Sequence, residues 1–310
     1  MIDATLPTIA GTSPAIRHAV GLVDRFARSQ MPILVVGDTG TGKELIAERV
    51  HAMSGRRGEL VDVNCGALPG DMIESLLFGH LRGSFTGAIA DSPGLIQRAH
   101  GGTLFLDELS SLPLTGQAKL LRVLETRTLR RVGDGEKRAV DFRLVAAVQE
   151  NVGLLVERGT FRLDLAQRVS GVVIELLPLA SRLEDIAPLA HYFAATHGCA
   201  LDTDAVRVLM THSWPGNVRE LKVTIERAAI GSGRHVLTAE VIVEAMPAWA
   251  LGSAGRGDAS VIIRACAEAN WDAIRAAELL GISRATLYRR LKRHRLALGL
   301  CSRTRNLIPC

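Results

Sequence analysis

The sequence predicts an α/β body built on a parallel sheet, a small helical segment after it, and a helix-turn-helix tail. Three observations support this prediction: a glycine-rich phosphate-binding motif after an apolar run, a second apolar run that ends in Asp-Glu, and a basic C-terminal end. The 310 residues, 47% of them hydrophobic, are enough for two domains and a small third.

The phosphate-binding motif directly follows the apolar run 33–36 and precedes a segment with helical apolar spacing. Strand, glycine turn and helix in this order are the context that a P-loop requires. Glycines let backbone N–H groups turn toward a polyphosphate, and the helix N-terminus adds its dipole. A glycine-rich surface turn is the alternative. The residues predicted to bind the cofactor here are Gly37, Asp38, Thr39, Gly40, Thr41, Gly42, Lys43 and Glu44.

The second apolar run, 101–106, ends in Asp107 and Glu108. A Walker B segment uses this layout to place one carboxylate near Mg²⁺ and another near the attacking water. The pattern is weak alone and becomes strong in a chain that already carries a P-loop. A further buried strand, 142–148, ends in the polar Gln149. Because these strands alternate with helical segments, we expect a parallel sheet with nucleotide at the carboxyl ends of its strands.

Two other segments, an aromatic-bearing loop and a pair of arginines, are candidates for function. The stretch 83–88 places the lone aromatic Phe85 among small residues, and a plain surface loop is the alternative. Arg162 and Arg168 stand six residues apart on or next to a helix, where two solvated charges are equally compatible with the spacing. From residue 183 the pattern is helical, which predicts a small lid, and the glycine-rich 252–258 is typical of a flexible linker.

The tail carries the positive charge of the chain. Residues 259–310 contain ten Lys or Arg against three Asp or Glu, whereas the remaining 258 residues sum to about −2. A helix near 273–280, the turn 281–283 and a basic helix of about 284–294 predict a helix-turn-helix, with a basic solvated helix end as the alternative. Ser283 should cap the last helix. Its predicted core is Leu279, Ile282, Leu287 and Leu291, and its predicted DNA contacts are Arg284, Thr286, Tyr288, Arg289, Arg290, Lys292 and Arg293.

Five widely spaced cysteines without a Cys-x-x-Cys pair disfavour a disulfide framework and a zinc site. No apolar run approaches the roughly 20 residues that span a bilayer, and the N-terminus lacks the layout of a signal peptide. We therefore expect a soluble, cytoplasmic protein without a membrane partner.

On these residues the chain resembles the bacterial enhancer-binding proteins, the AAA+ activators of sigma-54 RNA polymerase, from about residue 8 to 298. The P-loop of that family also ends in Gly-Lys-Glu. The hexapeptide Gly83-Ser84-Phe85-Thr86-Gly87-Ala88 is similar to its signature loop, Gly-Ala-Phe-Thr-Gly-Ala, which touches sigma-54. The run 214–221 matches a second family motif, and the tail is similar to a Fis-type helix-turn-helix.

The resemblance implies an ATP-dependent activator that binds enhancer DNA and converts the closed promoter complex to the open one. It implies an AAA+ α/β core (1–172), a helical lid (173–249), a linker (250–258) and a helix-turn-helix (259–310). The implied cofactors are ATP and Mg²⁺, and the implied partners are sigma-54 RNA polymerase, double-stranded DNA and copies of the same chain in a hexameric ring. With the P-loop starting at residue 37, we expect no preceding receiver or sensor domain, and control either by a separate regulatory protein or by expression level.

Residue roles follow from the same resemblance. Lys43 is the Walker A lysine, and Asp107 is the acid that binds Mg²⁺. Glu108 is the acid that activates water, and it is also a second candidate ligand of the metal. Asn64 matches the asparagine that holds Glu108 until the γ-phosphate is sensed, and Gln149 stands where a sensor asparagine is usual. The remaining matches are Arg162 and Arg168 as arginine fingers acting in the neighbouring subunit, and Arg227, or alternatively Arg219, as the second sensor.

Several departures from the family pattern leave the catalytic groups intact. They are Ser84 for alanine, Gln149 for asparagine, Leu163 for glutamate, Ala180-Ser181 for Arg-Glu and Trp271-Asp272 for Gly-Asn. Two other functions compete with the activator. An AAA+ remodeller without a promoter role would have a substrate-gripping pore loop instead of the hexapeptide. A non-catalytic DNA-binding repressor would have lost the loop or the Walker acids.

Overall fold

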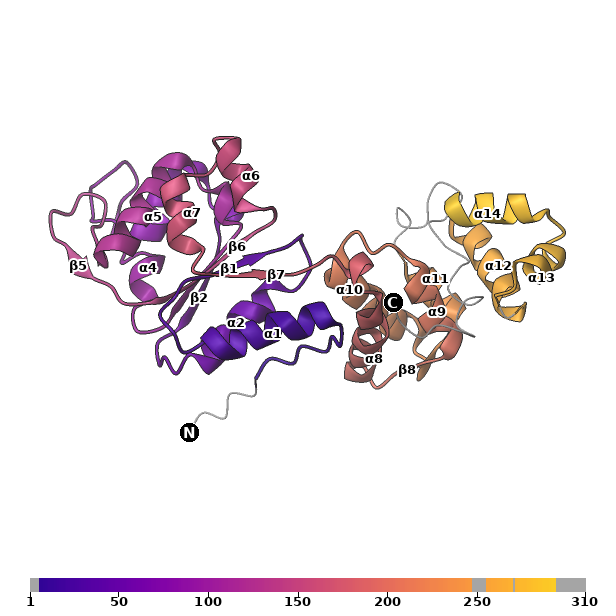
Figure 1. The fold of residues 1–310 in the computed structure, drawn as a ribbon. Helices are drawn as coiled ribbons and strands as arrows, with labels where there is room; N and C mark the ends of the chain where they lie inside the picture. The colour runs from indigo at the N-terminus through magenta and orange to yellow at the C-terminus, as the bar shows by residue number, and fades with distance from the viewer. Residues whose placement is uncertain (1–5, 247–254, 270, 294–310) are drawn as a thin grey trace. The chain divides into compact units, whose positions relative to one another are not determined.

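The computed structural model describes residues 6–246, 255–269 and 271–293, and the chain forms two compact units (Figure 1). The first unit contains Pro14–Pro178 with the N-terminal residues up to Ile9. The second contains everything from Leu179 onward together with the short segment Ala10–Ser13. Each unit is described separately below.

The first unit is built on five parallel strands in the order β2-β3-β6-β1-β7. Their bounds are β1 Ile33–Val36, β2 Leu60–Asn64, β3 Thr103–Asp107, β6 Arg143–Val148 and β7 Val172–Glu175. The P-loop follows a strand of a parallel sheet, as the sequence predicted, and the structure shows that this strand, β1, is an interior one between β6 and β7. Because β7 pairs with β1, the sheet extends past residue 172, where the sequence placed the end of the core.

Helices cover both faces of this sheet. Successive side chains of a strand point to opposite faces, so the apolar residues of β1 pack against helices on both sides. Ile33 and Val35 pack with α1 (Pro14–Phe26) and α2 (Lys43–Met53) on one face. Leu34, between them, joins the cluster on the other face. That face is covered by α3 Ile73–Phe78, α4 Leu95–Arg98, α5 Leu114–Thr126, α6 Val152–Glu157 and α7 Leu163–Val169. An antiparallel pair, β4 (Thr128–Leu129) and β5 (Arg138–Ala139), follows α5 and projects from the layers (Figure 1).

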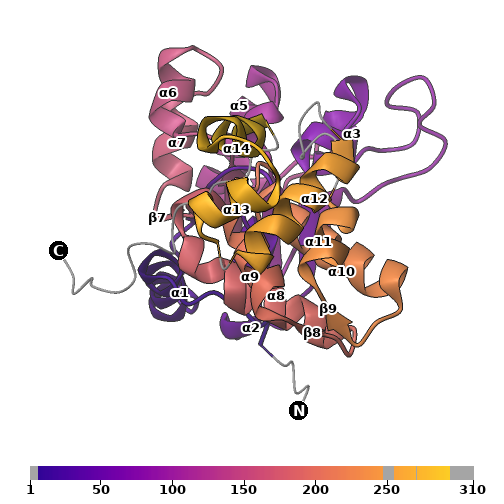
Figure 2. The same ribbon diagram turned by 90° about the vertical axis from the view of Figure 1, so that its right-hand side faces the viewer.

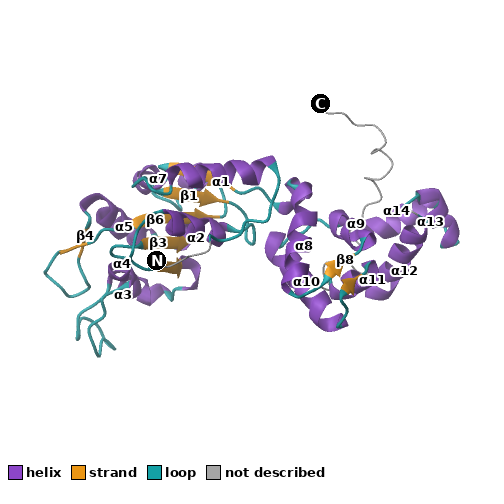
Figure 3. Ribbon diagram, turned by 90° about the horizontal axis from the view of Figure 1, so that it is seen from below, coloured by secondary structure: helices purple, strands orange, loops and turns teal. Residues whose placement is uncertain are grey.

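The second unit is helical apart from a two-stranded pair (Figure 3). Its bounds are α8 Ile186–Thr196, α9 Thr203–Thr211, α10 Asn217–Ser232, α11 Ala239–Ala245, β8 Ala200–Leu201 and β9 Val236–Leu237. Trp214 is fully buried and donates its indole N–H to the carbonyl of Leu209 (2.8 Å). The predicted lid is therefore a packed helical module with its own core.

The segment Ala10–Ser13 belongs to this unit through one buried carboxylate. Asp185, with no exposed surface, accepts hydrogen bonds from the backbone N–H groups of Thr12 (2.5 Å) and Ser13 (2.6 Å) and from the Ser13 hydroxyl (2.8 Å). Arg182 adds an ion pair at 3.4 Å. A residue pair 173 positions apart in the chain thus contributes to the core of the second unit.

Three further helices, α12 Gly255–Glu268, α13 Ala273–Leu279 and α14 Arg284–Arg293, form the helix-turn-helix (Figure 2). Among them α12 packs against α11, and α13 and α14 pack against α12. Leu287 and Leu291 are buried as predicted, and Ile282 is partly buried. The Ser283 hydroxyl accepts from the Thr286 N–H at 3.2 Å, which confirms the predicted cap.

Two details of the tail differ from the prediction. Leu279 is 56% exposed, so it does not belong to the core. Helix α12 begins at Gly255, inside the predicted linker 250–258, and its burial of Ile262, Ile263 and Cys266 in the core stabilises it. Residues 250–254 lie outside the described residues. None of the helices in the described part of the chain has the length and apolar character to cross a bilayer.

Candidate nucleotide-binding site

The P-loop connects β1 to the N-terminus of α2 at the carboxyl edge of the sheet. Gly40 (φ 80°) and Gly42 (φ 105°) adopt the left-handed backbone that glycine takes without steric cost. Gly37 approaches Leu176 so closely that a Cβ would lie 2.7 Å from its carbonyl oxygen. These glycines therefore shape a loop that aims backbone N–H groups at one point, next to the positive end of an 11-residue helix.

Lys43 is the first residue of α2 and is only 8% exposed. Its ammonium group donates to the carbonyl oxygens of Gly37 (2.8 Å) and Asp38 (3.1 Å), across the mouth of the loop. The ammonium group is thus held against the backbone of the loop, where the oxygens of a bound polyphosphate would replace these carbonyl oxygens as its acceptors. The loop and its lysine fit the triphosphate of a nucleotide.

The two acids follow β3 at the same edge. Asp107 accepts the backbone N–H of Glu108 (2.9 Å), and Glu108 adopts a left-handed backbone (φ 51°), which is unusual for a residue with a side chain. The Glu108 carboxylate accepts a hydrogen bond from the Gln149 amide at 3.0 Å, and a Cβ at Gly66 would lie 2.3 Å from its other oxygen. The direction of Glu108 is therefore fixed by its backbone, by Gln149 and by the absence of a side chain at residue 66.

Negative charge accumulates around these acids. The pKa of the Asp62 carboxyl is raised by burial first and then by the charges of Glu44 and Asp107. The pKa of the Cys65 thiol is raised to about 12, again by burial first and then by the charges of Asp107 and Glu108. A divalent cation would relieve this field. Because Mg²⁺ commonly takes one or two carboxylates together with phosphate oxygens and water, Asp107 at the edge of the P-loop fits it.

Asn64 lies beside Asp107 in the register of β2 and β3. Its side-chain oxygen accepts from the backbone N–H groups of Gly66 (2.8 Å) and Ala67 (3.1 Å), which caps a short turn. The partner of Glu108 in this structure is Gln149, from the end of the neighbouring strand β6. The longer glutamine side chain therefore makes the contact that the resemblance gave to Asn64.

Both predicted arginine fingers are exposed: Arg162 is the N-cap residue that precedes α7, and Arg168 lies in the last turn of that helix. Arg162 pairs with Asp164 through two contacts, Nε to Oδ1 (3.0 Å) and Nη2 to Oδ2 (2.7 Å). This pairing raises the pKa of Arg162 and lowers the pKa of Asp164, chiefly through the side-chain hydrogen bond. Arg168 donates to the carbonyl oxygen of Leu124 at 2.9 Å. In the described part of the chain neither arginine forms a hydrogen bond or ion pair with Asp107 or Glu108; their partners are Asp164 and the Leu124 carbonyl.

Gln117 orders the segment that carries Arg162, and the sequence gave no sign of this role. Its fully buried amide donates to the carbonyls of Leu112 (2.8 Å) and Thr160 (3.0 Å) and accepts from the backbone N–H of Arg162 (2.9 Å). The only trace of it in the sequence is a glutamine among the apolar residues of the segment 114–126, for which no helix was predicted. Removing this amide would leave buried backbone groups without partners.

The two candidate second sensors lie on α10 of the second unit. Arg227 donates to the carbonyl oxygen of Ala245 at 2.6 Å, at the C-terminal end of α11. Arg219 is exposed in the first turn of α10. It follows Asn217, whose side chain accepts the backbone N–H of Leu179 at 2.7 Å. The contact of Arg227 gives it a structural role and leaves Arg219 as the better candidate.

The hexapeptide 83–88 forms a closed turn at the surface of the first unit. The Gly83 N–H donates to the Ala88 carbonyl (2.9 Å), and the Ala88 N–H donates to the Phe85 carbonyl (3.0 Å). Gly83 (φ 78°) and Gly87 (φ 103°) have left-handed backbones that close the turn. Phe85 is 38% exposed and packs edge-on against the His80 ring at 5.1 Å, so a large apolar side chain stands at the tip.

The same turn rests on the β4–β5 hairpin. The Leu81 N–H donates to the Val132 carbonyl (3.0 Å), and a Cβ at Gly133 would lie 2.6 Å from the Cβ of Ser84. The Ser84 hydroxyl is buried without a hydrogen-bond partner among the described residues. The departure from alanine at this position therefore adds a polar atom that the turn does not satisfy.

The predicted DNA-binding residues follow one another on α14 in the second unit. Arg284, Tyr288, Arg289 and Lys292 are exposed, whereas Thr286 and Arg290 are half-buried. Arg293 is the last residue of the helix, and its side chain lies outside the described set. The helix therefore presents cations and one aromatic to solvent over a core of Leu287 and Leu291.

Comparison with known proteins agrees with this architecture. Residues 9–175 match the sigma-54 interaction domain, 180–250 the AAA+ ATPase lid domain and 258–294 the Fis family of bacterial regulatory proteins. The chain is 40% identical over 305 residues to the Nif-specific regulatory protein of Klebsiella pneumoniae, covering 92% of this chain and 58% of that protein. It thus spans under two thirds of that relative's length.

A relative of similar length is the pathogenicity locus probable regulatory protein HrpS of Pseudomonas savastanoi pv. phaseolicola, 41% identical over 88% of this chain and 93% of its own. Among solved structures, NtrX from Brucella abortus in complex with ADP has a TM-score of 0.71 at 30% identity, covering 92% of this chain and 69% of that one. NtrX has also been solved in complex with ATP. From the matched domains, and from the Walker acids, P-loop and hexapeptide that lie within them, the chain belongs to the sigma-54 interaction domain family of AAA+ proteins with a Fis-type helix-turn-helix.

Proposed function

We propose that the chain is an ATP-hydrolysing transcription activator that remodels sigma-54 RNA polymerase at promoters. One observation carries the proposal: a complete P-loop and acid pair occupies one edge of a sheet whose unit also presents Phe85 on a closed, glycine-hinged turn. The remodeller without a promoter role gives no reason for that turn. The repressor gives no reason for intact Asp107 and Glu108. Nucleotide complexes of the related NtrX support ATP as the cofactor.

The residues divide the chemistry among themselves. The P-loop N–H groups and Lys43 bind the phosphates. Mg²⁺, when bound, neutralises phosphate charge, and Asp107 is its proposed protein ligand, with Glu108 within reach. Glu108 polarises the attacking water, and Gln149 holds its carboxylate in the required direction. Asn64, engaged here in capping its own turn, remains a proposed sensor that would act after this turn rearranges.

Arginines complete the site from outside the unit. Arg162 and Arg168 are exposed, and in the described part of the chain neither bonds to Asp107 or Glu108, which supports action on a neighbouring copy. A homo-oligomer, and by family likeness a hexameric ring, would then be a condition of turnover, because the arginines that stabilise the negative charge of the transition state come from the neighbouring subunit. We favour Arg219 over Arg227 as the second sensor because Arg227 is already bonded to Ala245.

The helix-turn-helix at the C-terminal end is the proposed DNA-binding part of the chain. The exposed cations of α14 support binding to a double-stranded enhancer site, with affinity that falls steeply with salt. Sigma-54 RNA polymerase is the proposed partner of the turn 83–88. The proposal includes a separate regulatory protein that controls the activity of the chain.

The deciding experiment is transcription in vitro from a sigma-54 promoter with hydrolysable or non-hydrolysable ATP. Open complexes should form only with hydrolysable ATP. Thr86→Ala and Phe85→Ala should abolish them while ATP turnover stays within a few-fold of wild type. Ser84→Ala is the matched control, because it alters the same turn without touching the tip, and it should remain active. Full open-complex formation by both tip variants would remove the turn from the mechanism.

A further inference from the structure

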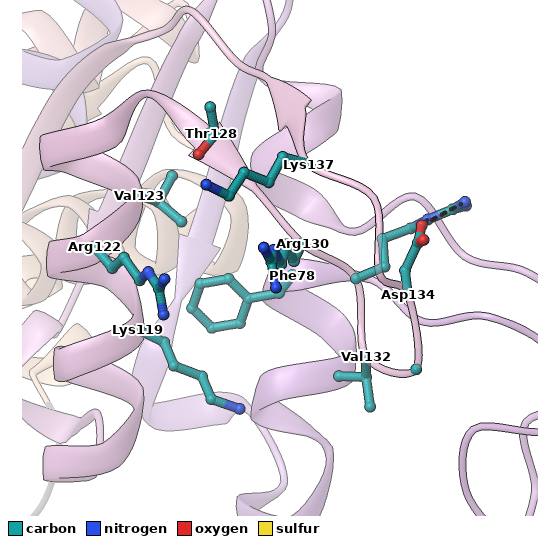
Figure 4. Close-up of a pocket in the computed structure, with 11 residues that line it drawn as sticks. Phe78, Lys119, Arg122, Val123, Thr128, Arg130, Val132, Asp134 and Lys137 are labelled. Atoms are coloured by element: carbon teal, nitrogen blue, oxygen red, sulfur yellow. Dashed lines mark hydrogen bonds and ion pairs between the residues drawn. The ribbon is translucent and has the colours of Figure 1, made fainter.

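A hollow of about 370 Å³ lies between α5 and the β4–β5 hairpin in the first unit (Figure 4). Phe78 and Val123 form its apolar part, and cationic side chains surround them in the close-up. The lining includes five Lys or Arg side chains but a single acid, Asp134. Because the chain outside residues 259–310 sums to about −2, such a concentration of positive charge departs from its surroundings.

Part of this charge is already neutralised. Lys119 pairs with Glu74 on α3, and Arg131 pairs with Asp134 at 3.2 Å. For the other three cations, Arg122, Arg130 and Lys137, the described residues provide no ion pair. All three are exposed and flank the same hollow from two elements, α5 and the hairpin. Three uncompensated charges around an apolar floor suit an anion that has an apolar body.

We propose that this hollow, the cationic pocket, binds the phosphate backbone of DNA. Guanidinium groups match phosphate oxygens through paired N–H donors, while the nearly buried Phe78 and Val123 form the floor beneath the cations. DNA is bound mainly through such contacts, which position a protein without reading sequence. The cationic pocket is separate from α14, which belongs to the other unit.

The position of the cationic pocket favours DNA over a free anion. Val132 lines it and donates its N–H to the Gly79 carbonyl (2.9 Å), while its own carbonyl accepts from Leu81, so the pocket and the turn 83–88 share one hydrogen-bonded frame. This step rests on the proposed function, in which the turn engages polymerase on promoter DNA. A duplex held there would fix the distance between the turn and the DNA that polymerase must open.

The test uses full-length protein with Arg284→Ala, Arg289→Ala and Arg290→Ala, so that binding by α14 is weakened and residual binding to a duplex without a cognate site can be measured. Binding constants are determined between roughly 50 and 200 mM salt. In this background Arg122, Arg130 and Lys137 are changed together to Gln. If each neutralises one phosphate, the slope of log affinity against log salt should become less steep by about 2.7.

The matched control, called the α1 control, changes to Gln three arginines on α1 or just after it, at positions 17, 25 and 28; these arginines are likewise exposed. It removes the same net charge from the same unit, and its slope should stay near that of the background. Charge-preserving Arg122→Lys with Arg130→Lys should also retain the slope. ATP turnover checks that each variant is folded, because none of these residues touches the nucleotide site.

Equal slopes for the pocket variant and the α1 control would overturn the proposal. So would an unchanged DNA slope accompanied by lost binding to polyglutamate, since the pocket would then take an acidic peptide. Sigma-54-dependent transcription is scored separately on protein with an intact α14. Its absence in the unaltered chain would refute the proposed function, whereas a changed slope would still stand as evidence for the pocket.

Discussion

The contact between Gln149 and Glu108 gives the sharpest prediction. Gln149→Leu keeps the size of the side chain and removes the amide that donates to Glu108 at 3.0 Å. The carboxylate would then lose one of the constraints on its direction, while the P-loop and Lys43 are untouched. We expect ATP binding to persist and turnover to fall, because Glu108 must face the attacking water.

The magnitude follows from the strength of this hydrogen bond. A bond to a charged acceptor contributes roughly 1.5–3 kcal/mol, and partial exposure of Glu108 lowers this to about 1–2 kcal/mol. If the full amount is lost in the transition state, kcat should fall about 5- to 30-fold, since 1.36 kcal/mol is about tenfold in rate. The Kd for ATP should change less than about twofold, because the bond does not involve the phosphates.

Steady-state ATPase assays and direct nucleotide binding by equilibrium titration separate these two quantities. Gln149→Asn is the graded control: its amide is one methylene shorter, so kcat should fall between wild type and Gln149→Leu. A wild-type kcat in Gln149→Leu, or a raised one, would show that the contact does not orient the base. A large loss of ATP affinity would show instead that Gln149 acts on the phosphates.

Four other predictions follow from the same unit. Glu108→Gln should bind ATP and lose turnover, measured by titration and phosphate release, and wild-type hydrolysis would contradict the Walker B assignment. Gln117→Met should displace the Arg162 segment and lower kcat at least tenfold, yet regain activity when mixed with Lys43→Ala protein, which separates a finger defect from misfolding. Ser84→Ala removes a buried hydroxyl without a described partner, so the unfolding free energy from urea titration should rise by about 1 kcal/mol. The pKa of the Cys65 thiol is raised to about 12, so at pH 8 only about one thiol in 10⁴ is ionised, and the thiolate fraction grows as the pH approaches 12. Because the thiolate is the reactive form, alkylation at pH 8 followed by mass spectrometry should leave Cys65 largely unmodified.

Local chemistry explains what could be predicted from the sequence. The order of strand, glycine turn and helix predicted where Lys43 lies, and short continuous apolar runs indicated the buried strands, because a strand covered on both faces has apolar residues throughout. Asp107 and Glu108 were placed correctly at a strand end because a parallel sheet brings all its carboxyl ends to one edge. Each of these inferences depends on residues that are close together in the chain.

The details that escaped prediction depend on distant backbone. Gln117 matters through carbonyl and N–H groups of residues 112, 160 and 162, which no spacing reveals. The partner of Glu108 depends on side-chain length: glutamine at 149 reaches it, whereas Asn64 turns back to cap its own segment. Leu279 looked like a core residue by periodicity, but the short α13 leaves it on the open side.

The pairing of Asp185 with the segment Ala10–Ser13 has a consequence for how the chain is made. The N-terminal segment of this contact leaves the ribosome first, and its partner follows 173 residues later. At about 5–20 residues per second the wait is roughly 10 to 35 s. During that time the whole first unit can fold while the second cannot finish. A fragment that starts at Leu179 would lack these donors permanently, so dissection of this protein should keep residues 10–13 with the helical unit, for example by circular permutation.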